Sequence, residues 1–262
     1  MPNTLHVDYE LKTRDESEKI IEEAMKCARE EIPKGAVANY IPELGLVDPN
    51  QLGICIYPLQ GEKIQLGDWD TRFTMQSISK IVSLCVALEL FGSEKLFEKV
   101  GAEPSGEAFN SLVELDLNSN KPYNPLINSG ALAVAGMLIE EVSFHDMLRF
   151  ARELCDDDQI VKTLMLTCGM YDGSGTYAVE VGIPTKSGVG GGLLAVSDKR
   201  AGIGVFGPSL DSKGNSIAGC RLLKEIANKL RLTLFFDTDL LHASRKKYSL
   251  NDFPKHIPNL PR

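Results

Sequence analysis

The sequence has no excess of basic residues. Its 262 residues include 28 lysines and arginines against 36 aspartates and glutamates, which gives a formal net charge of −8. Nucleic acids and anionic membrane surfaces are held through basic surfaces, so we expect neither as a partner. The basic cluster from Arg245 to Lys247 is short and lies in a polar C-terminal stretch, where we interpret it as solvated.

Long apolar runs and an export signal are also missing. No stretch of about 18 apolar residues is present, so no transmembrane helix is predicted. The first ten residues, MPNTLHVDYE, lack a basic segment followed by an apolar one, which argues against a secretory signal. The six cysteines show neither C-x-x-C nor Cys/His spacing, so we expect reduced thiols, no metal site and a cytoplasmic location.

Hydrophobic periodicity and turn residues divide the chain into helical and extended segments. The expected elements are a helix over 15–31, a hairpin from 52–59 and 63–68, helices from about 77, 128 and 144, strands over 175–184, 187–197 and 201–208, and a helix over 217–230. Extended segments toward both ends with helices between them predict an α+β fold with a mostly antiparallel sheet. We expect a single domain over 1–262, with a sheet subdomain from about 15–72 and 161–235 and a helical part over 73–160.

A serine and a lysine stand at the start of an apolar helix. Ser77 and Lys80 are three residues apart and therefore share one helix face, and Thr74 is placed to cap the helix. The apolar run that follows, as far as Gly92, predicts a buried helix that desolvates Lys80 and lowers its pKa. A neutral lysine can take a proton from a hydroxyl, so Ser77 is a candidate nucleophile with Lys80 as its base.

The S-x-x-K pattern is a weak signal by itself, because a capping serine and a snorkelling lysine also produce it. The same pattern recurs at Ser244 to Lys247, in a polar segment. A second element, Lys186 to Gly188, opens an apolar run and resembles the K-[ST]-G element of penicillin-recognising enzymes. A strand edge there would place the N–H of Val189 opposite that of Ser77, giving two donors for an oxyanion.

Five stretches resemble the motifs of the serine-dependent glutaminases, in that family's order. They are YIPEL at 40–44, FTMQSISK at 73–80, KPYNPLINSGA at 121–131, CGMYDGSG at 168–175 and PTKSGVGGG at 184–192. The resemblance implies a fold like that of the β-lactamases and transpeptidases, and hydrolysis of L-glutamine to L-glutamate and ammonia. It implies no metal or organic cofactor, and a homodimer or homotetramer.

The resemblance also implies roles for individual residues. Ser77 would be the nucleophile, Lys80 its base, and Tyr171 a second proton-transfer group near the leaving ammonia. The N–H groups of Val189 and Ser77 would form the oxyanion hole. The residues implied to bind polar groups of the substrate are Tyr40, Gln76 and Asn128. Other interpretations stay open for two of them, because Tyr171 could be a core tyrosine and Asn128 a helix cap.

The family pattern is interrupted in one place. Only 43 positions separate Asn128 from Tyr171, whereas the family carries between these motifs a long segment that holds the amino and carboxylate groups of the substrate. That segment is absent after about Ile160, through a genuine deletion, an engineered or mispredicted sequence, or the omission of a disordered portion. Two other functions therefore stay open: a catalytically silent glutaminase-like oligomeric or binding protein, and a penicillin-recognising acylhydrolase.

Overall fold

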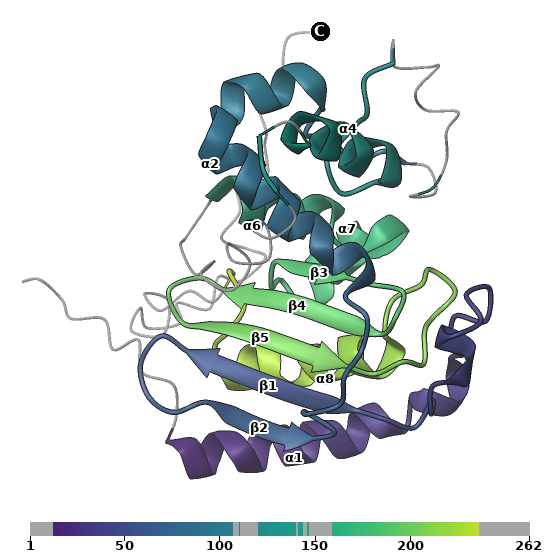
Figure 1. Cartoon of the computed structure of the whole chain (residues 1–262). Coiled ribbons are helices and arrows are strands. Elements are labelled where there is room, and N and C mark those ends of the chain that lie inside the picture. The colour runs from purple at the N-terminus through teal and green to yellow at the C-terminus, as the bar shows by residue number, and fades with distance from the viewer. Residues whose placement is uncertain are drawn as a thin grey trace, which may run out of the picture.

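A five-stranded antiparallel sheet of order β2-β1-β5-β4-β3 lies at the centre of the computed structural model (Figure 1). Its strands are β1 (Gly53–Pro58), β2 (Ile64–Gly67), β3 (Thr185–Ser187), β4 (Gly192–Ser197) and β5 (Ala201–Phe206). The structure describes residues 13–106, 110, 120–139, 141–143, 146 and 159–235. Ile56 of β1 pairs with Ile203 of β5, so segments far apart in the sequence are neighbours in the sheet.

Two helices cover one face of this sheet. α1 (Arg14–Arg29) and α8 (Ile217–Lys229) lie side by side against it (Figure 1). Thr13 caps α1 through a capping box with Glu16, which satisfies N–H groups that the first helical turn leaves unpaired. Leu193 and Ala195 of β4 point into the core on this side. The alternation of side chains along a strand therefore turns their neighbours to the opposite face.

The opposite face carries the helical part of the molecule. Its elements are η3 (Gln76–Ile78), α2 (Ser79–Lys99), α4 (Asn128–Leu138), α6 (Gln159–Cys168), η4 (Tyr171–Gly173) and α7 (Ser174–Glu180). Leu84 of α2, Val134 of α4 and Met165 of α6 meet in a second buried cluster, against which Leu194 of β4 packs. The sheet thus separates two cores.

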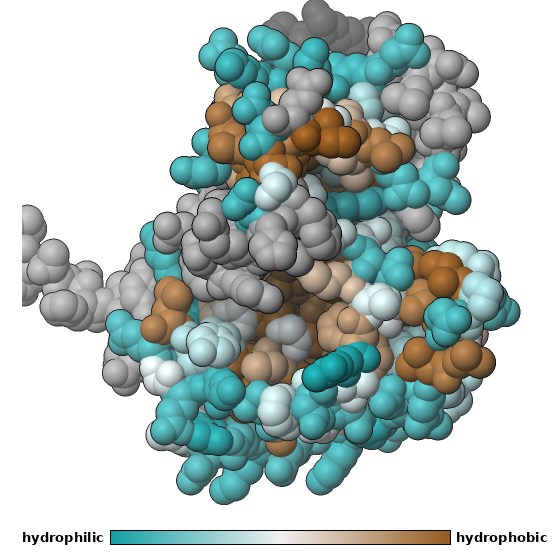
Figure 2. Space-filling view, viewed as in Figure 1, coloured by the Kyte–Doolittle hydropathy of each residue, from teal (hydrophilic) through white to brown (hydrophobic). Residues whose placement is uncertain are grey.

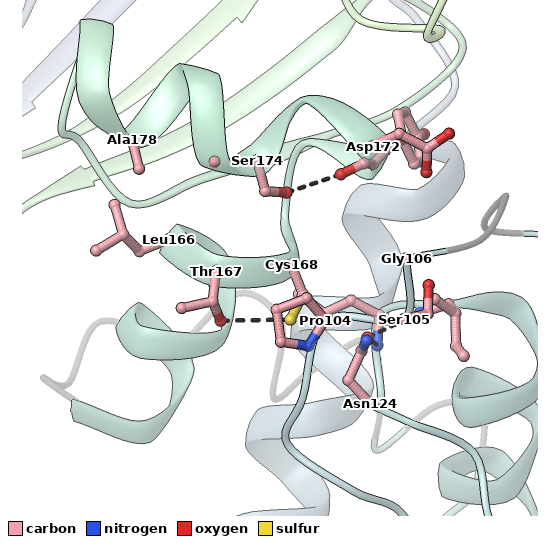
Figure 3. Close-up of a pocket in the computed structure, with 14 residues that line it drawn as sticks. Pro104, Ser105, Gly106, Asn124, Leu166, Thr167, Cys168, Asp172, Ser174 and Ala178 are labelled. Carbon is pink, nitrogen blue, oxygen red and sulfur yellow. Dashed lines mark hydrogen bonds between the residues drawn. The ribbon is translucent and has the colours of Figure 1, made fainter. Parts of the chain in front are cut away.

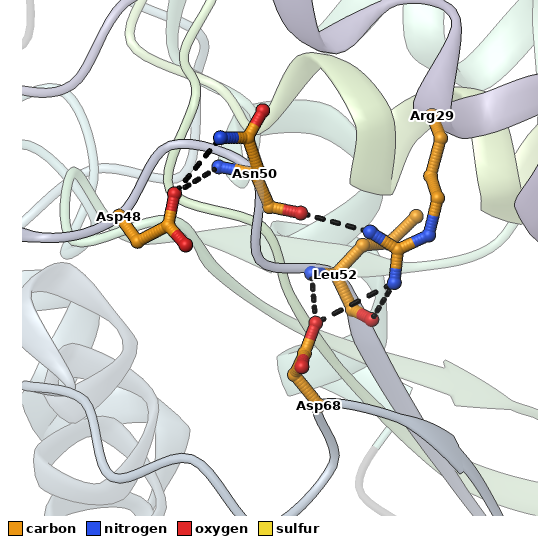
Figure 4. A network of polar contacts seen from close by, with 5 residues as sticks. All are labelled: Arg29, Asp48, Asn50, Leu52 and Asp68. Carbon is orange, nitrogen blue, oxygen red and sulfur yellow. Dashed lines mark hydrogen bonds and ion pairs between the residues drawn. The ribbon is translucent and has the colours of Figure 1, made fainter.

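The C-terminal end of α1 is fastened to the start of β1 by a polar network (Figure 4). Arg29 donates to the carbonyl oxygens of Asn50 at 2.8 Å and of Leu52 at 3.3 Å. Asp68 accepts from the N–H of Leu52 at 2.8 Å, and Asp48 accepts from the side chain and the N–H of Asn50. Two short 3-10 turns, η1 (Ile32–Lys34) and η2 (Leu44–Leu46), lie between α1 and β1.

The predicted α+β class is confirmed, as are the first helix, the hairpin, the strands over 187–197 and 201–208, and the last helix. The strand expected over 175–184 is wrong. Tyr177 and Val181, four residues apart, both face the core, which is helical spacing, and Gly182 ends the segment at φ +66°. The helix expected over 144–154 lies outside the described residues except for Asp146.

α6 was not predicted, although its buried residues Val161, Leu164 and Met165 have helical spacing. α2 extends from Ser79 to Lys99 across a kink at Gly92, whose φ of +73° and ψ of 168° are non-helical. The apolar helix predicted as far as Gly92 therefore breaks there, and a second helical stretch follows it to Lys99. None of the helices within the described ranges is long and apolar enough to cross a lipid bilayer.

Candidate active site

Ser77 lies in the single 3-10 turn η3, immediately before α2, rather than inside the α-helix. The predicted cap by Thr74 is wrong, because neither η3 nor α2 has a side-chain cap and Thr74 instead accepts from the Gln76 amide at 3.0 Å. Gln76 has a φ of +47°. A non-glycine residue in this region carries backbone strain that the surrounding structure must support, and such residues gather at functional sites.

Lys80 extends from the first turn of α2 toward the start of α4. Its Nζ donates to the carbonyl oxygen of Leu126 at 3.0 Å and to Oδ1 of Asn128 at 2.7 Å. Burial lowers the pKa of Lys80 to about 8, because the charged form loses its hydration. The expected desolvation of this lysine is therefore present, and its ammonium is held by a carbonyl and an amide.

Asn128 does not cap α4, whose N-cap is Ile127, and it is instead the first residue of that helix. The turn before the helix is held by Asn124, which is 1% exposed. Its Oδ1 accepts from the N–H groups of Leu126 at 2.9 Å and Ile127 at 3.2 Å, and its Nδ2 donates to the carbonyl of Glu103 at 2.9 Å. Asn124 was not predicted as a site residue, although an asparagine before a proline is a known turn signal.

Tyr171 lies in η4 with a φ of +51°. Its hydroxyl donates to the carbonyl oxygen of Ser187 at 3.1 Å. Burial raises the pKa of Tyr171 to about 12, while hydrogen bonds from the Ser77 hydroxyl and the Val189 N–H to the phenol oxygen act to lower it. The structure therefore brings the Ser77 hydroxyl, the Tyr171 phenol and the Val189 N–H to one point.

The turn between β3 and β4 places Val189 beside η3. The N–H of Gly191 donates to the carbonyl of Gly188 at 2.9 Å, and Gly191 has a φ of +91°. A Cβ at position 188 would come within 2.7 Å of the carbonyl oxygen of Met75. Glycine at 188 thus allows the turn to approach the chain just before Ser77 closely, as an oxyanion hole built from both segments requires.

A cleft of about 830 Å³ opens over these residues. Five predicted site residues line it: Tyr40, Gln76, Ser77, Asn128 and Val189. The Tyr40 side chain is 66% exposed at the mouth of the cleft. Charged groups of both signs, Asp211 and Lys213, also line the cleft, and neither was predicted from the sequence.

Lys80 and Tyr171 do not line this cleft but stand beside it. Tyr171 forms part of a second cavity of about 450 Å³, between the 104–106 loop, the end of α6 and the start of α7 (Figure 3). Thr167 and Cys168 meet in that cavity at 3.3 Å, and burial raises the pKa of the Cys168 thiol. Within the described ranges no three His, Cys, Asp or Glu side chains gather closely enough to hold a metal ion.

Comparison with known proteins identifies the family of this chain. The sequence profile of the family described as Glutaminase matches residues 35–162 and 157–235. The chain belongs to the glutaminase family. A glutaminase of Fusobacterium nucleatum is 38% identical over 301 residues, covering 82% of this chain and 99% of the relative, and one of Clostridium tetani is 38% identical over 304 residues, covering 83% and 98%.

Solved glutaminase structures share the fold. A probable glutaminase of Bacillus subtilis superposes with a TM-score of 0.67 at 29% identity, covering 86% of this chain and 99% of that chain. The probable glutaminase ybaS gives a TM-score of 0.74 at 25% identity, covering 87% and 100%. The likeness to glutaminases, expected from five short motifs, is confirmed.

The comparisons also locate the interruption of the family pattern. The two profile matches overlap at residues 157–162, which include Ile160, after which the family pattern is interrupted. Since 82% of 262 residues is about 215, about 86 of the 301 aligned positions in the Fusobacterium nucleatum relative have no counterpart in this chain. The shortening therefore lies next to α6, in the helical part of the molecule.

Proposed function

We propose that this chain hydrolyses L-glutamine to L-glutamate and ammonia through an acyl-enzyme on Ser77. The observation that carries the proposal is the meeting of Ser77, Tyr171 and the Val189 N–H. Desolvated Lys80 is three residues after Ser77 and donates to Asn128, which lines the same cleft as Ser77. A nucleophile, a base and an oxyanion donor within one site are what acyl transfer requires.

The reaction follows from these positions. Neutral Lys80 takes the proton of the Ser77 hydroxyl while Oγ attacks the side-chain amide carbon, and the N–H groups of Ser77 and Val189 stabilise the oxyanion that forms. The C–N bond breaks as a proton passes through Tyr171 to the leaving nitrogen, which departs as ammonia. Water then attacks the ester, releases L-glutamate and returns Ser77 to its starting state.

Substrate binding is proposed for the residues around the cleft. Tyr40, Gln76 and Asn128 would donate and accept hydrogen bonds to the polar groups of glutamine, since each lines the cleft beside Ser77. The segment that is absent here is the one expected to hold the amino and carboxylate groups of the substrate, and about 86 aligned positions are missing. Each charge-assisted hydrogen bond contributes about 1.5 to 3 kcal/mol, so we expect a lower affinity for glutamine than in a full-length relative.

Ammonia release from L-glutamine by the purified chain, beside its Ser77→Ala variant, tests the proposal. We expect glutamine-dependent release in the parent chain and none in the variant, at equal folded content. A chain that melts cooperatively yet releases no ammonia at high substrate concentration would instead support the catalytically silent binding protein, for which the shortened helical part is the favouring observation. Mass spectrometry after incubation with benzylpenicillin separates the third candidate, because only a penicillin-recognising enzyme would carry the drug on Ser77.

Covalent trapping gives a second test that does not require turnover. The Bacillus subtilis glutaminase forms a covalent complex with 5-oxo-L-norleucine on reaction with 6-diazo-5-oxo-L-norleucine. We expect the same reagent to modify this chain once, at Ser77, and not to modify Ser77→Ala. Labelling without turnover would show that the nucleophile is active and that a later step fails.

Assembly and location are proposed from surface and thiol chemistry. The helical part bears exposed apolar side chains, including Leu132 on α4, Ile139 directly after α4 and Leu90 on α2, and Figure 2 shows apolar surface over this part of the molecule. Such a surface favours a homodimer or homotetramer, which light scattering on the purified chain would detect. Cysteines in the described residues are free thiols, in keeping with a reducing cytoplasm, and cell fractionation tests this.

A further inference from the structure

Lys186 of β3 is a fully buried lysine beside the proposed active site, with 0% of its surface exposed. Its Nζ donates to the carbonyl oxygens of Ser187 at 2.6 Å and Gly169 at 3.1 Å. The same nitrogen lies 4.5 Å from the centroid of the Tyr171 ring. Among the described residues no carboxylate forms an ion pair with it.

These three contacts match the bonding capacity of an ammonium group. Lysine has three N–H donors, and two carbonyl oxygens and the face of an aromatic ring provide three acceptors in different directions. Gly169 directly follows α6, so its carbonyl lies at the negative end of that helix, which also favours a cation. The buried ammonium of Lys186 is thus compensated by two backbone carbonyl groups and the ring of Tyr171, without a carboxylate from the described part of the chain.

Tyr171 shares one of these acceptors. Its hydroxyl donates to the carbonyl oxygen of Ser187, the atom that also accepts from Lys186. The backbone of Tyr171 has a positive φ, so its position is held against strain by its surroundings. Ser174 contributes by donating to the Tyr171 carbonyl at 2.9 Å, and Lys186 lies against the ring itself.

We propose that Lys186 is a positioning residue for Tyr171: through the Ser187 carbonyl and the ring face it fixes the phenol toward Ser77 and favours negative charge on it. The consequence for catalysis rests on the function proposed above, because the phenol is the group that passes a proton to the leaving ammonia. A cation against the ring stabilises the phenolate that exists while that proton is away.

The charged and titratable groups around Lys186 come from three neighbouring elements. They are Tyr171 of η4, Lys80 of α2 and Cys168 of α6. Burial and the positive charge of Lys80 lower the pKa of Lys186 well below its usual value, and Cys168 opposes this. A change in the protonation of Lys186 is therefore expected at a lower pH than for an exposed lysine, and its contact with the ring should transmit that change to Tyr171.

The test uses Lys186→Met, which keeps the length of the side chain and removes its charge. Lys224→Met on α8 is the matched control, because Lys224 is exposed and its removal changes the net charge equally. Tyrosines labelled with 13C at Cζ report the phenol by NMR without turnover, and the resonance that disappears in Tyr171→Phe belongs to Tyr171. We expect this resonance to have the same chemical shift in the full chain and in the control, and a different one in Lys186→Met, because the cation that contacts the ring is gone.

Steady-state kinetics then test whether Lys186 affects the hydrolysis of glutamine. In Lys186→Met we expect kcat for glutamine to fall about tenfold to a hundredfold with KM within about twofold, the signature of an interaction made in the transition state. An unchanged Tyr171 resonance in Lys186→Met overturns the proposal, whether or not the parent chain releases ammonia, and so does an equal loss of kcat in Lys224→Met. Absence of both turnover and Ser77 labelling in the parent chain refutes the proposed function instead. If Lys186→Met does not fold, Lys186→Gln, whose amide can still donate to a carbonyl, takes its place in each measurement.

Discussion

Replacing Asn128 by aspartate is expected to move the pH dependence of Ser77 acylation to higher pH. Lys80 has a pKa of about 8, so about one molecule in ten carries it neutral at pH 7 and about nine in ten at pH 9. If neutral Lys80 is the base, acylation in the parent chain should rise about tenfold between these values. A lysine with its ordinary pKa of about 10.4 would give a rise of nearly a hundredfold, with no plateau.

The aspartate would add a negative charge at the position where the Asn128 amide now accepts from Lys80 at 2.7 Å. An opposite charge at such a distance raises the pKa of a lysine by about one to three units. The neutral fraction at pH 7 would then fall from about a tenth to about a hundredth or less, and the plateau of the profile would move beyond pH 9. The loss should therefore be large at pH 7 and shrink as the pH rises.

The assay is the limiting first-order rate of Ser77 modification by 6-diazo-5-oxo-L-norleucine, followed by intact mass from pH 6 to 10. Saturating reagent separates this rate from changes in binding. Asn39→Asp is the matched control, because Asn39 lines the same cleft, whereas Lys80 donates to Leu126 and Asn128. An unshifted profile in Asn128→Asp, or an equal shift in Asn39→Asp, would refute the assignment of Lys80 as the base.

Three further predictions concern stability, each measured by chemical denaturation. Lys80→Met should raise the free energy of unfolding at pH 7. The pKa of Lys80 is lower in the folded state than in the unfolded state, so Lys80 adds stability only as the pH rises from about 8 toward 10.5. A destabilised variant at pH 7 would contradict this. Gly130→Ala should destabilise the chain, since its Cβ would lie 1.8 Å from the Asn124 carbonyl oxygen, whereas Gly136→Ala on the same helix meets open space and should stabilise by up to about 1 kcal/mol. Asn124→Ala removes three hydrogen bonds from a buried turn and should cost about 2 to 3 kcal/mol, and a loss below about 0.5 kcal/mol would contradict the role of this turn.

Local relations between the candidate site residues could be predicted from the sequence. Ser77 and Lys80 are one turn apart, so their proximity follows from the backbone alone, and the apolar run after them was enough to predict that Lys80 is desolvated. The acceptors of Lys80 could not be predicted in this way, because Leu126 and Asn128 lie 46 and 48 residues further along the chain. Periodicity carries no information about such pairings, and only the family resemblance brought Asn128 into consideration.

Burial was the hardest property to foresee for polar residues. Lys186 was noticed as part of a motif, but a lysine in a sequence is expected at the surface unless it is paired. Its compensation comes from the carbonyl oxygens of Gly169 and Ser187, and backbone acceptors leave no trace in the side-chain pattern. The strand predicted over 175–184 failed for a related reason. Valine and tyrosine favour strands locally, but burial of Tyr177 and Val181 on one side of the segment requires helical spacing.

Because β1 pairs with β5, the helical part is a long insertion between two strands of one sheet. The chain leaves the sheet at the end of β2 and returns at β3 after roughly 120 residues. With the additional positions of the Fusobacterium nucleatum relative, the same segment would be roughly 200 residues long. Closing the shorter loop changes the entropy cost by only about 0.5 kcal/mol, since that cost grows with the logarithm of length. The sheet with α1 and α8 can therefore stay the same while the segment between β2 and β3 changes in length during evolution. Such changes should affect the active site more than they affect the stability of the sheet.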